Sequence, residues 1–158
     1  MKICDFGSSK FIHKDKTKST PYIVSRYYRA PELLLGSNTY EDKIDIFATG
    51  CIMAELFNLT PLFPGKTEGL QFFEQMCVLG KPSKQYFTKF NIPGSFLNFF
   101  NEMDEIVPYD LNKLLNKNKH YSDEDARLAK DLLAKVICWE PKERLSAAEA
   151  LNHPFFAN

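Results

Sequence analysis

The sequence predicts a mainly α-helical domain, because apolar residues recur at helical spacing and little in it favours strands. Residues 44–59 carry apolar side chains on nearly every helical face, which is typical of a helix at the centre of a helical domain. Further helices are predicted at residues 68–79 and 126–138. The chain has 158 residues, 44% of them hydrophobic, so it can form a core without disulfides or metals.

The N-terminal third contains mostly short elements. Residues 1–4 are compatible with a short strand, and the polar residues 7–21 indicate a surface loop. Residues 31–35 are expected to form a short helix that starts at a proline and stops at Gly36.

The C-terminal half is delimited by turn and capping signals. Gly80 closes the helix at 68–79, and residues 81–121, rich in Phe, Asn and Pro, are expected to be irregular with one or two short helices. Ser122 is expected to start the helix that continues through 126–138. Ser-Ala-Ala-Glu at residues 146–149 is a capping-box pattern that opens a last short helix.

Composition excludes several classes of partner and compartment. Lys+Arg and Asp+Glu are 20 each, so no bulk charge favours nucleic acid or an acidic membrane. Asp45 and Glu55 interrupt the most apolar stretch, which is too short and too charged to cross a bilayer, and the first five residues lack the apolar core of a signal peptide. The four cysteines are scattered without a CxxC pair, which favours a reducing cytoplasmic or nuclear compartment.

Several motifs occur in a fixed order. Asp-Phe-Gly at residues 5–7 places a carboxylate where it could hold Mg²⁺ against nucleotide phosphates, although such an Asp is more often a turn former. The others are Ser-Arg-Tyr-Tyr-Arg-Ala-Pro-Glu at 25–32, Asp-Ile-Phe-Ala-Thr-Gly at 45–50, Leu-Phe-Pro-Gly at 62–65, Pro-Lys-Glu-Arg-Leu at 141–145 and His-Pro-Phe-Phe at 153–156.

With these motifs the chain resembles the eukaryotic protein kinases of the CMGC group along essentially its whole length. Residues 5–10 and 22–28 are most similar to the glycogen synthase kinase 3 (shaggy) family. Residues 20–26 and 63–67 are also similar to the pre-mRNA-processing kinases and the dual-specificity tyrosine-regulated kinases. The resemblance implies the C-terminal lobe of the kinase fold, with the activation segment and the helical subdomain but without the N-terminal lobe and the catalytic loop. A partial kinase domain at 1–158 would then comprise 1–32 (Asp-Phe-Gly to Ala-Pro-Glu), 33–80 (central helices), 81–121 (irregular insert) and 122–158 (terminal helices).

The resemblance implies a serine/threonine protein kinase that transfers the γ-phosphoryl group of ATP, with Mg²⁺, to protein substrates, some carrying a priming phosphate. The catalytic Asp and the nucleotide-binding Lys of the family have no counterpart in this sequence. The chain as given is therefore expected to be inactive alone and to bind ATP and Mg²⁺ poorly. The alternative is a catalytically inactive fragment that binds substrates or scaffold proteins.

The resemblance also assigns functional residues. Asp5 corresponds to the Mg²⁺ ligand, and Tyr22 to the activation-loop tyrosine that becomes phosphorylated, with an unmodified loop tyrosine as the alternative. Lys10 corresponds to a basic residue for a primed substrate's phosphate, although a solvated lysine is as good an explanation. Ser25 corresponds to a hydroxyl near the catalytic Asp, or else is a surface serine. Arg26 and Arg29 complete the substrate-docking set, and both lie where they could bind a phosphate on Tyr22.

Five further residues match structural positions. Phe6 corresponds to the ring whose packing separates active from inactive states, next to Gly7. Glu32 and Arg144 are predicted to form a buried ion pair, because the family resemblance joins them. Asp45 is expected to accept backbone hydrogen bonds from a catalytic loop that this sequence does not contain, which would leave its carboxylate without those donors.

Overall fold

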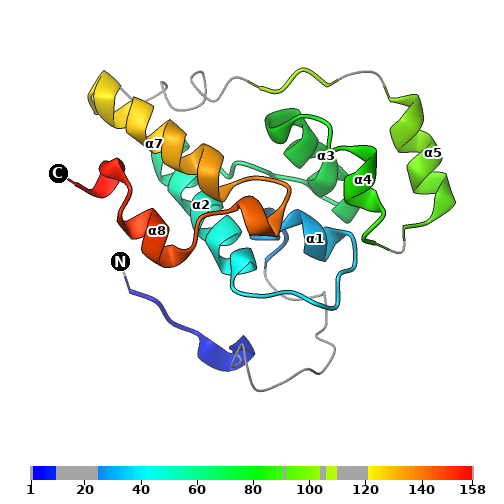
Figure 1. Cartoon of the computed structure of the whole chain (residues 1–158), viewed down its shortest axis with the longest axis horizontal. Helices are drawn as coiled ribbons and strands as arrows, with labels where there is room; N and C mark the ends of the chain where they lie inside the picture. Colours follow the sequence, from blue (N-terminus) through cyan, green and yellow to red (C-terminus); the bar gives the residue numbers. More distant parts are fainter. Residues whose placement is uncertain (1, 10–24, 91, 104–105, 110–120, 158) are drawn as a thin grey trace.

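The computed structural model describes residues 2–9, 25–90, 92–103, 106–109 and 121–157. These residues form α-helices and 3₁₀ turns, and no β-strand occurs among them (Figure 1). The prediction of a mainly α-helical domain is confirmed. The strand expected at residues 1–4 is wrong for residues 2–4, which form no β-bridge with another described residue.

Seven α-helices and four 3₁₀ turns are found among the described residues. The α-helices are α1 (Pro31–Leu34), α2 (Lys43–Asn58), α3 (Glu68–Leu79), α4 (Lys84–Phe87), α5 (Gly94–Glu102), α7 (Asp123–Val136) and α8 (Ala147–Leu151). The 3₁₀ turns are η1 (Phe6–Ser8), η2 (Arg26–Tyr28), η3 (Pro141–Glu143) and η4 (Pro154–Phe156). In Figure 1, α7 and α8 lie on one side of the body with α2, whereas α3, α4 and α5 lie on the other.

Both predicted helix starts in the C-terminal half are present. The Ser122 hydroxyl accepts a hydrogen bond from the Asp125 amide at 3.1 Å, and the Asp125 carboxylate accepts one from the Ser122 amide. Ser146 and Glu149 make the same reciprocal pair at the start of α8. Each pair satisfies two amides that the helix itself leaves unpaired, which fixes where these helices begin.

The main core lies where α2 packs against α7. Gly50 allows this close contact, since a Cβ at that position would lie 2.6 Å from a side-chain carbon of Ile137 and 2.8 Å from one of Val136. Phe47, fully buried, stacks on Phe63 with ring centroids 6.0 Å apart. The buried apolar residues of this core are Ala30, Leu33, Ile44, Phe47, Cys51, Ala54, Leu62, Phe63, Ala129, Leu132, Leu133, Val136 and Ile137.

One face of α2 remains open to solvent. Ile52 is 40% exposed and Leu56 66% exposed, and Leu59, which ends the helix in a left-handed conformation, is 75% exposed. The helix expected at the centre of the domain is therefore covered on its other faces and not on this one. The sequence of a helix shows how apolar each of its faces is, but not which other segment covers each face. Here no described segment buries the side chains of Ile52, Leu56 and Leu59.

A second core consists mainly of aromatic rings contributed by α3, α4 and α5. Its buried members are Phe72, Met76, Tyr86, Phe87 and Phe100. Trp139 joins it from the segment after α7, with its ring centroid 5.2 Å from that of Phe72, and its indole N–H donates to the Gly80 carbonyl at 3.2 Å. The irregular insert predicted at 81–121 therefore contains two short helices in its described part, and they are held by aromatic packing.

Candidate functional site

The candidate site is built around residues 25–32, here called the docking segment. η2 turns the chain, with the Tyr28 amide donating to the Ser25 carbonyl and the Arg29 amide to the Arg26 carbonyl, both at 3.1 Å. Pro31 then starts α1 at a position where a helix needs no amide donor. Ser25 is exposed, whereas Arg29 is only 4% exposed. The segment thus runs from the surface into the interior.

A buried ion pair joins the end of the docking segment to the C-terminal region. The Arg144 guanidinium donates two hydrogen bonds to the Glu32 carboxylate, both at 2.7 Å, and the two residues are 2% and 4% exposed. The predicted Glu32–Arg144 pair is confirmed. The same guanidinium lies 5.0 Å above the Phe47 ring, so α2 also supports it.

The two arginines of the docking segment both contact residues 66–68. The Arg29 guanidinium lies 2.9 Å from the Glu68 carboxylate at the start of α3, and Arg26 donates to the Lys66 carbonyl at 2.7 Å. The Arg26 Nε is buried without a hydrogen-bond partner among the described residues. The geometry therefore makes both arginines attachments between the docking segment and residues 66–68.

Tyr28 connects the same segment to the central helix. Its hydroxyl donates to Glu55 of α2 at 2.7 Å. That hydrogen bond to a carboxylate, assisted by burial, raises the pKa of Tyr28 above its usual value of 10.0. The docking segment is consequently attached to α2, α3 and the C-terminal region together.

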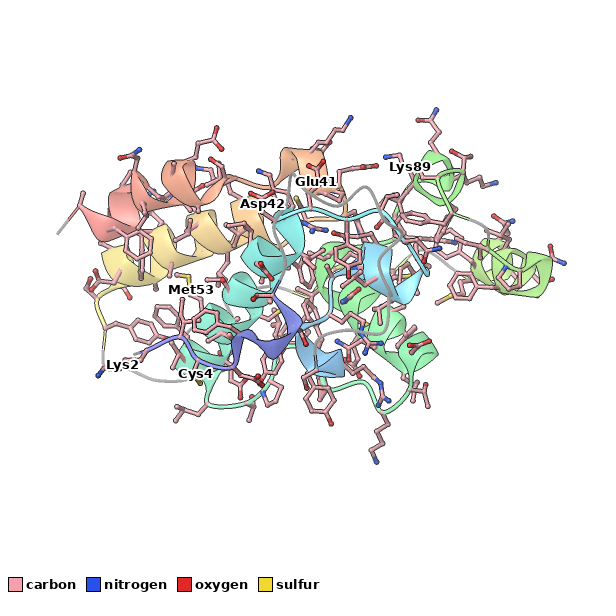
Figure 2. All side chains as sticks on the ribbon, turned by 90° about the horizontal axis from the view of Figure 1, so that it is seen from below. Lys2, Cys4, Glu41, Asp42, Met53 and Lys89 are labelled. Carbon is pink, nitrogen blue, oxygen red and sulfur yellow. The ribbon has the colours of Figure 1, made fainter. Side chains whose placement is uncertain are left out.

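The Asp-Phe-Gly residues lie apart from these contacts. Asp5 is exposed with a left-handed backbone (φ 62°), and the Phe6 side chain is 68% exposed, so the ring expected to pack is not packed among the described residues. In Figure 2, Lys2 and Cys4, which precede Asp5, lie toward the opposite end of the molecule from Lys89. Within the described ranges no group of three His, Cys, Asp or Glu side chains could hold a metal ion. Mg²⁺ in nucleotide sites is held by one or two carboxylates together with phosphates and water, and Asp5 could supply one of these carboxylates.

Asp45, in the first turn of α2, is exposed, so its carboxylate is not stranded in the interior. Partial removal from water, followed by the nearby Asp42 charge, raises the pKa of Asp45 above 3.8. The expected hydrogen bonds from a catalytic loop to this carboxylate stay a prediction.

Two predicted site residues, Lys10 and Tyr22, lie outside the described residues. Their roles in binding a primed substrate and in activation-loop phosphorylation therefore stay predictions.

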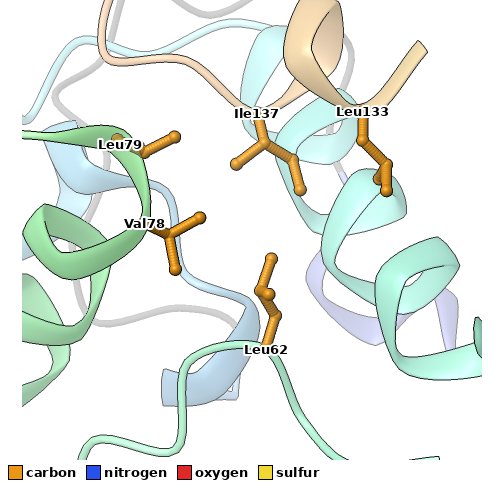
Figure 3. A pocket seen from close by; sticks show the side chains of 5 residues that line it. All are labelled: Leu62, Val78, Leu79, Leu133 and Ile137. Carbon is orange, nitrogen blue, oxygen red and sulfur yellow. The ribbon is translucent and has the colours of Figure 1, made fainter. Parts of the chain in front are cut away.

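A small apolar pocket lies between the end of α3 and the end of α7 (Figure 3). Five aliphatic side chains point toward its centre, and it has room for about one water molecule. The lining residues are Leu62, Val78, Leu79, Leu133 and Ile137. Because these five side chains offer no polar or charged group, the pocket is unsuited to a nucleotide.

Sequence reasoning missed the α3 partners of the docking segment. Glu68 pairs with Arg29, and two glutamines, Gln71 and Gln75, are fully buried while donating to backbone carbonyls of residues 27 and 29. Polar residues on an amphipathic helix usually face water, so their spacing gives no signal of a buried role.

Comparison with known proteins agrees with the motifs. The model of the protein kinase domain matches residues 1–156. This chain belongs to the protein kinase family. Its kinase relatives include glycogen synthase kinase 1 of Pyricularia oryzae, at 41% identity over 99% of this chain, and the protein kinase gsk3 of Schizosaccharomyces pombe, at 40% over 99%. The serine/threonine-protein kinase ICK of Mus musculus is 40% identical over the same share.

These relatives support the predicted similarity to the glycogen synthase kinase type within a CMGC-like set. The matched kinase region spans 36%, 38% and 23% of the three relatives' own lengths. None of the helices in the described ranges is long and apolar enough to cross a membrane.

Proposed function

We propose that this chain forms the helical, C-terminal lobe of a serine/threonine protein kinase, which in the intact protein transfers the γ-phosphoryl group of ATP to protein hydroxyls. The kinase-domain match over residues 1–156 is the observation that carries the proposal. Relatives named as serine/threonine kinases support it. The buried Glu32–Arg144 pair supports the lobe assignment, because it joins the two motifs that the resemblance pairs.

The docking segment is the proposed site for the protein substrate. Its exposed start at Ser25 and its fixed end at Glu32 suit a surface that a peptide chain can contact while the backbone stays in place. Arg26 and Arg29 are proposed to shape this surface through their attachments to residues 66–68 rather than as freely solvated cations. Lys10 is proposed to add positive charge for substrates that carry a priming phosphate.

ATP and Mg²⁺ are the proposed cofactors of the intact enzyme. Asp5 would supply one carboxylate to Mg²⁺, whose role is to neutralise charge on the phosphates. Tyr22 is proposed to be phosphorylated, which would add about −1.5 to −2 charge at that position. Scaffold proteins are further proposed partners, and the cytoplasm or nucleus is the proposed location.

The test is a phosphoryl-transfer assay on the longest natural form of the protein that carries this chain. Purified wild type is incubated with Mg²⁺, radiolabelled ATP and a mixed protein substrate such as casein, beside the Asp5→Asn variant. We expect label on serine and threonine with wild type and a loss of at least about a hundredfold with Asp5→Asn, because the metal loses its carboxylate. Absence of label with wild type, or equal label with both proteins, would refute the proposal.

Phosphopeptide mass spectrometry of the same active protein tests the modification. We expect a phosphate on Tyr22, and full coverage of that peptide without phosphate would contradict it.

A further inference from the structure

Two glutamines on the inner face of α3 contact the backbone of the docking segment. The Gln71 side-chain amide donates to the Tyr27 carbonyl at 3.2 Å, and that of Gln75 donates to the Arg29 carbonyl at 2.9 Å. Both side chains are completely buried. Since the two glutamines are four residues apart, they lie on one face of the helix and reach carbonyls two residues apart in the segment.

From these contacts we propose that Gln71 and Gln75 are positioning residues for the protein substrate: through the carbonyls of Tyr27 and Arg29 they fix the backbone that the substrate contacts. The inference rests on the proposed function of the docking segment. The hydrogen bonds of both glutamines go to backbone groups of residues 27, 29 and 65 and not to the proposed metal ligand Asp5. Their effect would therefore be on how well the protein substrate binds and not on phosphoryl transfer itself.

The helix that carries the glutamines is itself firmly placed. The Gly65 amide donates to the Gln71 side-chain oxygen at 3.0 Å, and a Cβ at Gly65 would lie 2.3 Å from the Gln71 backbone nitrogen. Thr67 caps α3 by accepting from the Leu70 amide at 3.2 Å. Only glycine permits this close approach. The turn before α3 therefore fixes the position of the helix, and with it the positions of both glutamines, relative to the docking segment.

The two glutamines differ in how much of their amide is used. Gln71 uses its oxygen for Gly65 and its nitrogen for Tyr27. Gln75 uses its nitrogen for Arg29, whereas its oxygen is buried without a hydrogen-bond partner among the described residues. Replacing Gln75 by Met, which has nearly the same length, removes one hydrogen bond and at the same time one buried unpaired acceptor. It also leaves the buried Arg29 carbonyl without this donor, so the change should loosen the docking segment and lower overall stability slightly.

The kinetic experiment uses the longest natural form of the kinase and a peptide derived from a protein that it phosphorylates. For Gln75→Met we expect the KM for the peptide to rise about three- to tenfold, the effect of one neutral hydrogen bond, while kcat and the KM for ATP stay at wild-type values. Loss of uniform substrate binding has this signature, whereas a merely structural role would lower kcat or the active fraction. Gln85→Met, on the exposed surface of α4, is the matched control and should behave as wild type.

A second readout does not depend on activity. In hydrogen–deuterium exchange on the same proteins, Gln75→Met should speed exchange of the amides of residues 25–30. Exchange of the amides of α2 and α7 should stay unchanged, and the melting temperature should fall by no more than about 4 °C. If wild type transfers no phosphate, the proposed function fails, but this measurement still decides whether Gln75 holds the segment.

Three results would overturn the inference. The first is that Gln75→Met changes neither the KM for the peptide nor the hydrogen–deuterium exchange of the amides of residues 25–30. The second is a fall in kcat without a change in the KM for the peptide. The third is that both Gln75→Met and Gln75→Leu unfold. The third result would show that Gln75 is needed for folding and has no separate role in positioning the docking segment.

Discussion

Arg144 allows the most demanding test of how the docking segment is held. Its guanidinium donates twice to Glu32, at 2.7 Å each. It also donates to the backbone carbonyls of Cys138, Lys43 and Trp139 at 3.0–3.2 Å. The Arg144 side chain is completely buried, so these bonds are made out of contact with solvent. Removing the guanidinium would leave the Glu32 carboxylate buried without a cation.

The expected magnitudes follow from that geometry. Arg144→Ala should lower the free energy of unfolding by about 3–5 kcal/mol, the cost of breaking a buried pair by removing one partner. Arg144→Lys keeps the charge but cannot reproduce the planar fork, and loses at least two hydrogen bonds, so we expect a loss of about 2 kcal/mol. Glu32→Ala combined with Arg144→Ala should cost less than the sum of the single changes, since the unpaired carboxylate is gone. The recovery should be partial, because three carbonyls still lack their donor.

Urea unfolding followed by circular dichroism measures these differences. The control is Lys89→Ala, which breaks the ion pair with Glu140 on the surface, where Lys89 is 52% exposed. That change should cost at most about 1 kcal/mol. The reasoning fails if Arg144→Ala costs no more than Lys89→Ala, or if the single effects of Arg144→Ala and Glu32→Ala simply add.

Three further predictions concern stability. Gly50→Ala should lower the free energy of unfolding by about 1–3 kcal/mol in a thermal melt, because the added methyl overlaps side chains at the end of α7; an unchanged melting temperature would contradict this packing. Ser122→Ala should cost about 1 kcal/mol in urea unfolding through loss of the α7 cap, and no change would mean that the cap is not formed. The hydrogen bond from Lys135, and after it that from His153, lowers the pKa of Asp131 below 3.8. The charged Asp131 carboxylate therefore stabilises the folded state fully above pH 3.8, and this contribution is lost as the pH falls through the pKa of Asp131 in the folded state. Asp131→Asn should therefore lose less stability than wild type between pH 5 and pH 2.5, and equal losses would contradict the assignment.

Local signals in the sequence predicted the helices well where those signals are strong. Ser122 and Ser146 predict the starts of their helices because the hydrogen bonds of a capping box form within four residues and need no distant partner. Gly80 likewise ends α3 at the predicted residue with a positive φ of 77°. The Glu32–Arg144 pair spans 112 positions, and only the family resemblance joined its members.

Contacts that depend on the placement of whole elements could not be predicted. The open face of α2 at Ile52 and Leu56 is apolar, as its buried faces are, so composition does not distinguish them. Gln75 resembles any polar helix residue until the docking segment lies against it. One or two short helices were expected within residues 81–121, but Phe-rich irregular sequence has no periodicity that fixes where α4 and α5 begin.

Trp139 is an intrinsic fluorescence probe of the aromatic core. It is the single tryptophan of the chain, and it lies in the aromatic core with its ring centroid 5.7 Å from that of Tyr86. Its intrinsic fluorescence therefore reports on the packing of α3, α4 and α5, whereas far-ultraviolet circular dichroism is averaged over every helix. Coincident transitions would show that the two cores unfold as one cooperative unit. An earlier fluorescence transition would show that the aromatic core opens first, while the α2–α7 core is still folded.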